Sequence, residues 1–278
     1  MNFILGSIIT SSPLLLASMA ALISEFSGCM ALFLDGLINL CAFLCFAFTV
    51  VTKSPVYGIL LTIVTSVSFI TVMAYTIEKL NANRFLAALA INLLCNALSS
   101  TLSSIFFNTR GVLTDSDFVF AATQTKLNST VISYIIVILC YAFLKYTKAG
   151  LYIRISGSDS TVLYSKGTNV TQIRLLSWAI ATALGALAGS FLSLRISSFV
   201  PNISSGIGWT ALAVVFLGKK NTAAIIAAVL VFSASQYGAN NLQSIEMFKN
   251  IPPAFLLSMP YFCAILLILL TPQIRQKH

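Results

Sequence analysis

Long apolar runs separated by short polar segments dominate the sequence. Eight runs approach the ~20 residues that a helix needs to cross a bilayer, and they lie at residues 3–23, 29–51, 56–77, 85–107, 130–146, 174–194, 222–238 and 254–271. The runs lack the apolar and polar alternation of barrel strands, and lipid offers no hydrogen bonds, so each run is predicted to be a helix that satisfies its own backbone. The pattern therefore predicts an all-α polytopic bundle with eight full spans.

A ninth apolar run, residues 207–218, is too short to cross the membrane. A helix of this length rises only about 18 Å, whereas the hydrocarbon core is about 30 Å thick. We therefore expect a short or broken span here, within a single transmembrane domain that covers residues 1–278.

The composition excludes a soluble protein. Hydrophobic residues make up 58% of the chain and charged residues 8%, with a mean hydropathy of +0.94. The net charge of +9 is dispersed between the spans and forms no basic face, so it does not indicate nucleic acid as a partner. Membrane lipid is the expected surrounding for most of the chain.

The distribution of lysine and arginine predicts the orientation, because loops on the cytoplasmic side carry an excess of both. A long polar segment, residues 147–173, interrupts the apolar pattern, and we expect it to be cytoplasmic. Eleven basic residues then lie inside: Lys79, Arg84, Lys145, Lys148, Arg154, Lys166, Arg174, Lys219, Lys220, Arg275 and Lys277. Five lie outside: Lys53, Arg110, Lys126, Arg195 and Lys249. The N-terminus is thus predicted outside and the C-terminus inside.

Residues for catalysis or metal binding are scarce. The only histidine is His278, the last residue, and the six cysteines lie within apolar runs, where we interpret them as packing residues. Cys41 and Cys45 share a helical face, but two thiols without further ligands make a poor soft-metal site. No phosphate-binding G-x-x-x-x-G-K-[ST] motif occurs. We expect no metal, no cofactor, no catalytic residue and no ATPase site in this chain.

Polar residues inside two apolar runs are the candidates for a solute pathway. Asp35 and Asn39 are one helical turn apart in the second run. The fourth run carries a stripe on a single helical face: Asn92, Asn96, Ser99 and Ser103. Such residues either line an aqueous path, which is the interpretation we favour for the stripe, or form hydrogen bonds between helices.

Small residues recur at every fourth position of the sixth run. Ala181, Gly185 and Gly189 form the centre of this stripe. Small side chains allow the backbones of two membrane helices to approach closely, so the stripe predicts a helix-packing groove.

Three stretches together resemble the permease subunits of bacterial ABC importers for branched-chain amino acids, ribose and nucleosides. Residues 25–28, Glu-Phe-Ser-Gly, with Leu32, Asp35 and Gly36, are similar to the motif E-R-S-G-x-x-N-L-G-x-E-G of the nucleoside branch. Residues 154–176 are similar to R-x-x-G-x-N-P-x-A-A-x-x-x-G-I-x-V, with Asp159 and Ser160 in place of Asn-Pro. Residues 206–218 resemble G-x-G-[FY]-x-A-L-A-V-x-I-L-G most closely.

The resemblance implies a location in the bacterial cytoplasmic (inner) membrane and a set of partners. These are a second permease subunit in a heterodimer, cytoplasmic ATP-binding subunits, and an external substrate-binding protein or lipoprotein. It also implies that the 147–173 segment forms a short coupling helix against the ATPase, capped by Ser158 or Asp159. The expected coupling residues are Arg154, Gly157, Asp159, Lys166 and Gly167.

The resemblance favours a nucleoside as the solute, with riboflavin or a simple sugar as alternatives. A self-sufficient secondary transporter is the main competitor from another class, because Asp35 and a short half-helix could supply a coupling site. An intramembrane enzyme is disfavoured, since no nucleophile has a plausible base.

Overall fold

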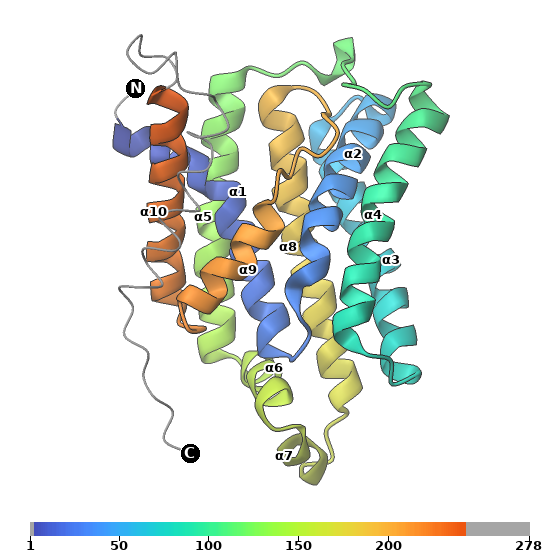
Figure 1. Ribbon diagram of the computed structural model, residues 1–278, viewed down its shortest axis with the longest axis vertical. Coiled ribbons are helices and arrows are strands. Elements are labelled where there is room, and N and C mark those ends of the chain that lie inside the picture. The colour runs from blue at the N-terminus through green and yellow to red at the C-terminus, as the bar shows by residue number, and fades with distance from the viewer. Residues whose placement is uncertain (1–2, 243–278) are drawn as a thin grey trace. The chain divides into compact units, whose positions relative to one another are not determined.

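The computed structural model describes residues 3–242. Its elements in chain order are α1 (Phe3–Phe26), the 3-10 helix η1 (Ala31–Phe33), α2 (Leu34–Thr52), α3 (Pro55–Lys79), α4 (Arg84–Phe107), the 3-10 helix η2 (Ser116–Phe118), α5 (Ala122–Tyr146), α6 (Lys148–Ser158), α7 (Ser160–Ser165), α8 (Val170–Ile196), α9 (Ile207–Leu217) and α10 (Thr222–Leu242). Figure 1 shows these elements. Within residues 3–242 the only strand-like pairing is an isolated bridge between Leu113 and Phe199.

The predicted helical class is confirmed for the described residues. Within residues 3–242 seven helices are long and apolar enough to cross a membrane: α1, η1 with α2, α3, α4, α5, α8 and α10. The run at residues 207–218 is the short helix α9. The eighth predicted span, residues 254–271, lies outside the described residues.

Local sequence determines where these helices begin and end. Pro55 occupies the start of α3, where its missing N–H costs nothing. Asn83 caps α4 by accepting hydrogen bonds from the backbone N–H groups of Phe85 and Leu86. Asn108 ends the same helix in the left-handed conformation, with φ +54°.

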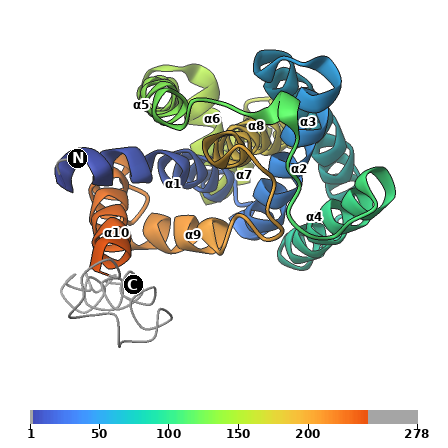
Figure 2. The same cartoon turned by 90° about the horizontal axis from the view of Figure 1, so that it is seen from above.

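The described chain divides into two compact units, and the larger is Ser12–Leu212. In this unit α2 and α8 lie side by side at the centre, and α3 and α4 pack against α2 (Figure 2). The predicted small-residue groove lies in the α2–α8 contact. A Cβ atom at Gly189 would overlap the Ile38 carbonyl oxygen, and one at Gly185 would lie 2.9 Å from a Leu37 methyl group. Ala181 is fully buried on α8.

The two ends of the larger unit differ. Helices α6 and α7 lie at one end, which we call the α6–α7 end, and the α4–α5 connection lies at the opposite end (Figure 1). That connection is fastened in place, because Leu113 and Phe199 exchange backbone hydrogen bonds of 2.9 and 3.0 Å. Phe118 of η2 is fully buried, with its ring centroid 4.9 Å from that of Phe46 on α2.

A buried arginine joins three helices near the same connection. Arg195, in the last turn of α8, donates hydrogen bonds to Ser129 and Thr130 of α5 at 2.8 and 3.0 Å and to the Ser12 hydroxyl of α1. A charge inside a membrane protein is costly unless polar partners surround it. The hydroxyl groups provide that environment.

The smaller unit comprises the described residues of Met1–Ser11 and Ala213–His278. Within it the first turns of α1 pack against α10. The Phe3 and Tyr237 rings meet edge to face with centroids 5.7 Å apart, and Gly6 leaves room for the Tyr237 ring.

Candidate functional site

A cavity of about 260 Å³, lined mostly by polar residues, lies among α2, α4 and the segment that precedes α9. Four of the six predicted pathway residues line it: Asn39, Asn96, Ser99 and Ser103. The remaining lining residues are Ser100, Arg110, Phe199, Pro201 and Asn202. The stripe predicted on the fourth run therefore shares a cavity with a residue of the second run.

Asn39 holds the segment before α9 against α2. Its side-chain oxygen accepts the backbone N–H of Ser204 at 3.0 Å, and its amide nitrogen donates to the side-chain oxygen of Asn96 at 2.8 Å and of Asn202 at 3.4 Å. Asn39 is only 2% exposed. One carboxamide thus orders two opposite walls of the cavity.

Asp35 and Asn92 do not line the cavity and instead bind backbone groups. The Asp35 carboxylate accepts the N–H of Gly208 at 3.1 Å, so it satisfies an N–H in the first turn of α9. The Asn92 side-chain oxygen accepts the N–H of Gly36. Gly36 permits this approach, because a Cβ atom there would lie 2.7 Å from that oxygen.

The lining chemistry suits an uncharged polar solute. The asparagines offer both donors and acceptors, and the serines offer hydroxyl groups. Arg110, an exposed residue of the α4–α5 connection, is the one charged side chain among the lining residues. A cation would meet no carboxylate on these walls.

Sequence reasoning missed the wall contributed by residues 199–202. Phe199 follows α8 and Asn202 precedes α9, so neither belongs to an apolar span. A local signal was present, since Pro201-Asn202 is a turn sequence and Asn202 adopts φ +58°. The turn gave no indication of which helix it would meet.

The expected coupling segment forms two helices, α6 and α7, where one short helix was predicted. Thr147 caps α6 by accepting the N–H of Gly150 at 3.0 Å. Asp159 ends α6 and caps α7, because its carboxylate accepts the hydroxyl and N–H of Thr161 at 2.6 and 3.0 Å. These two hydrogen bonds, the hydroxyl bond first, lower the pKa of the Asp159 carboxyl below its usual value. Asp159 is therefore an anionic cap at neutral pH.

Gly157 brings α6 into backbone contact with the turn after α1. A Cβ atom at Gly157 would lie 2.6 Å from the Gly28 nitrogen and would overlap the Phe26 carbonyl oxygen. Of the other expected coupling residues, Arg154 is half-buried on α6, whereas Lys166 and Gly167 are exposed in the turn after α7. Gly167 has φ +68°, a conformation that favours glycine.

An apolar cluster fastens α6 and α7 to α8. The buried side chains are Ile153 of α6, Leu163 of α7, and Val170 and Ile173 of α8. The polar segment seen in the sequence is therefore a packed substructure with an exposed outer face.

Comparison with known proteins identifies the family. The family model described as branched-chain amino acid transport system / permease component matches residues 3–270. The chain belongs to this permease family. The family resemblance is confirmed, and with seven candidate spans within residues 3–242 the permease is a multi-pass protein of the inner membrane.

Similar proteins cover the permease nearly end to end. The nucleoside ABC transporter permease protein NupC of Lactococcus lactis is 24% identical over 95% of this chain and 90% of its own length. The guanosine ABC transporter permease protein NupQ of Bacillus subtilis is 24% identical over 94% and 89%. Among solved structures, PsaBC from Streptococcus pneumoniae in complex with Fab has a TM-score of 0.53 at 14% identity and covers 99% of this chain and 94% of its own. That likeness concerns the fold alone.

Proposed function

We propose that this protein is a membrane subunit of an ATP-driven importer and forms the path for a nucleoside. The observation that carries the proposal is the end-to-end similarity to permeases named for nucleoside and guanosine transport. The cavity between α2 and α4 supports it, because amide and hydroxyl groups can bind the ring nitrogens and ribose hydroxyls of an uncharged nucleoside.

In the proposed assembly the N-terminus is outside and the C-terminus inside, so the α6–α7 end faces the cytoplasm. This orientation rests on the excess of lysine and arginine predicted at that end. The partners are a second permease subunit in a heterodimer, cytoplasmic ATP-binding subunits, and an external binding protein or lipoprotein. ATP hydrolysis belongs to the partner subunits.

In this proposal α6 and α7 receive the movement of the ATPase. Helix α6 is attached on one side to the turn after α1 through Gly157 and on the other to α8 through the apolar cluster. A force on α6 therefore reaches two transmembrane elements without a flexible link. The cavity residues Asn39, Asn96, Ser99 and Ser103 form the solute path, and Asp35 and Asn92 maintain its walls.

The decisive experiment is uptake by the complete importer in proteoliposomes. Radiolabelled guanosine, glucose and riboflavin are compared, with and without ATP, in the presence of the external binding protein. We expect ATP-dependent guanosine uptake that unlabelled nucleosides inhibit. ATP-dependent uptake of glucose or riboflavin without any nucleoside uptake would contradict the assigned solute.

The same preparation separates an ABC permease from a secondary transporter. Vesicles that contain this chain alone are expected to show no concentrative uptake under a proton or sodium gradient. Gradient-driven accumulation by the chain alone would overturn the proposed class.

The path assignment has its own test. Replacing Asn96 by leucine removes a polar wall of the cavity and should strongly reduce uptake while the protein level remains normal. Replacing the exposed Leu93 on the same helix by alanine is the matched control. Normal uptake by the Asn96 variant would show that α4 does not line the solute path.

A further inference from the structure

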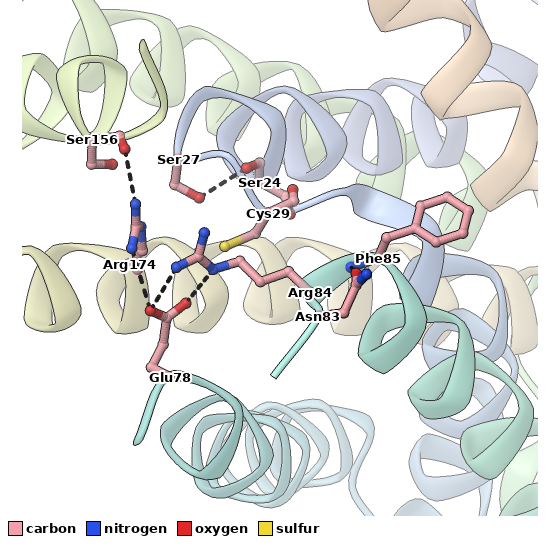
Figure 3. Close-up of polar contacts among 9 residues, drawn as sticks. All are labelled: Ser24, Ser27, Cys29, Glu78, Asn83, Arg84, Phe85, Ser156 and Arg174. Atoms are coloured by element: carbon pink, nitrogen blue, oxygen red, sulfur yellow. Dashed lines mark hydrogen bonds and ion pairs between the residues drawn. The ribbon is translucent and has the colours of Figure 1, made fainter. Parts of the chain in front are cut away.

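Glu78 is a nearly buried carboxylate that the sequence analysis did not single out. It lies in the last turn of α3, and its side chain is 4% exposed. Two cations contact it from different helices (Figure 3). A buried carboxylate with two arginine partners calls for a physical explanation, because its desolvation has to be offset by good geometry.

The first partner is Arg84, the first residue of α4. Its Nε and Nη2 atoms donate to the two oxygens of Glu78 at 2.8 and 3.1 Å. This two-pronged geometry fixes the orientation of the guanidinium as well as its distance. The end of α3 and the start of α4 are therefore held as one unit across the intervening turn.

The second partner is Arg174 of α8, which also contacts α6. Its Nη1 atom donates to Glu78 at 3.4 Å, and its Nη2 atom donates to the backbone carbonyl of Ser156 at 3.3 Å. Ser156 is buried on α6 and directly precedes Gly157. One planar guanidinium thus connects the coupling helix to the Glu78 carboxylate.

These contacts form a continuous path from α6 to the cavity. It runs from Ser156 through Arg174 and Glu78 to Arg84 and then along α4. Asn96 is twelve residues beyond Arg84, which is about 18 Å along a helix. Because a helix transmits displacement along its axis, a shift of α6 has a route to the cavity wall that does not pass through the Gly157 contact.

We propose that Glu78 is a positioning residue that transmits movement of α6 to α4 during transport. The inference rests on the proposed function and deepens it by naming the link between the coupling region and the path. Glu78 touches neither solute nor nucleotide. It acts by holding Arg84 and Arg174 in one arrangement, so that α4 follows α6.

The test uses the complete importer with all its subunits. The measured quantity is solute taken up per ATP hydrolysed, with Glu78→Gln, Arg174→Gln and the double variant. Each single variant should lower this ratio at least fivefold, because ATP is still hydrolysed while α4 no longer follows. The double variant should have a ratio no lower than that of the more impaired single variant, since the two substitutions remove the same linkage.

Two further variants separate linkage from general damage. Lys79→Gln removes an exposed charge in the same turn of α3 and should leave the ratio unchanged. Glu78→Asp keeps the buried charge but shortens its reach, and should give a ratio between those of wild type and Glu78→Gln. It provides a folded variant if Glu78→Gln assembles poorly.

A distance measurement distinguishes coupling from stabilisation. If Glu78 only stabilised the fold, its replacement would not change how the distances respond to ATP. Spin labels are placed at the exposed positions Ser158 on α6 and Leu86 on α4, each paired with a label on the exposed Val51 of α2. On ATP binding both distances should change in the wild type, whereas only the α6 distance should change with Glu78→Gln.

The outcomes for the two proposals are distinct. Uptake per ATP within twofold of wild type for Glu78→Gln, or an unchanged α4 movement in that variant, overturns the role of Glu78. A ratio for Glu78→Asp equal to that of wild type overturns it as well. If the wild-type complex transports another solute, only the nucleoside assignment fails, because the ratio can be measured with that solute.

Discussion

Replacing Asn39 by leucine is the sharpest test of how the cavity wall is held. Leucine has nearly the same shape as asparagine, so the change removes hydrogen bonds without opening a void. Two strong bonds disappear: the 3.0 Å bond from the Ser204 N–H and the 2.8 Å bond to Asn96. The Ser204 residue is fully buried, so its N–H is left without the side-chain acceptor.

The expected destabilisation follows from these two losses. An unsatisfied buried donor costs about 1–3 kcal/mol, and a lost hydrogen bond between partly hydrated groups costs about 0.5–1.5 kcal/mol. Asn96 is half-buried and borders the cavity, where water can replace its lost partner. We therefore expect Asn39→Leu to lower the free energy of unfolding by ~2–4 kcal/mol.

The assay is thermal unfolding of the purified permease in detergent. For a chain of this size each kcal/mol shifts the apparent Tm by roughly 2–4 °C, so the expected decrease is about 5–15 °C. Thr65→Val is the control, because Thr65 is exposed on α3 and its hydroxyl bonds only within its own helix. An Asn39→Leu protein as stable as the control would refute the assigned role of this carboxamide.

Three further changes test other contacts. Gly157→Val should separate α6 from the turn after α1 and reduce uptake per ATP at least fivefold in the reconstituted complex, whereas Gly111→Ala, in the open α4–α5 connection, should not. Asp159→Ala should destabilise α7 by removing its N-terminal cap and speed amide hydrogen exchange in residues 160–165. Since folding lowers the Asp159 pKa, this stabilisation is present above the ordinary carboxyl pKa and is lost as the pH falls through the lowered value, so the difference between the two proteins should vanish in acid. Gly189→Val should prevent the α2–α8 contact and abolish the monodisperse peak in size-exclusion chromatography, whereas Ala183→Val, half-buried on α8, should retain it.

The spans were predictable because lipid constrains the backbone locally. Each apolar run has to satisfy its own hydrogen bonds, so every run within the described residues is a helix, as predicted without knowledge of the packing. The largest difference is in α5, which begins at Ala122, eight residues before its apolar run. The ends of the polar 147–173 segment were equally visible. The division of this segment into α6 and α7 was not visible in the sequence. It depends on Asp159, which was expected to cap a single coupling helix and instead caps a second helix, α7.

The sequence predicted which face of α4 carries the polar residues of the candidate site, but not which partner each of these residues contacts. Periodicity placed Asn92 and Asn96 on the same stripe of α4. Whether an asparagine meets a cavity or a backbone N–H depends on the neighbouring helix, and here Gly36 lets Asn92 reach α2. Glu78 was missed because a carboxylate at the end of a span is usually solvated, and its partner Arg174 is 96 residues away in the chain.

The hydroxyl cluster around Arg195 has a consequence for biosynthesis. A ribosome makes Ser12, Ser129 and Thr130 before it makes Arg195, so all three hydroxyl-bearing segments have emerged when the guanidinium leaves the exit tunnel. The Arg195 guanidinium of the nascent α8 can therefore donate hydrogen bonds to hydroxyl groups that are already inserted. It is then not exposed to acyl chains without polar partners. A truncated messenger that ends after α8 should still give a stably integrated product, whereas deletion of α5 should leave α8 prone to retrieval by membrane quality-control proteases.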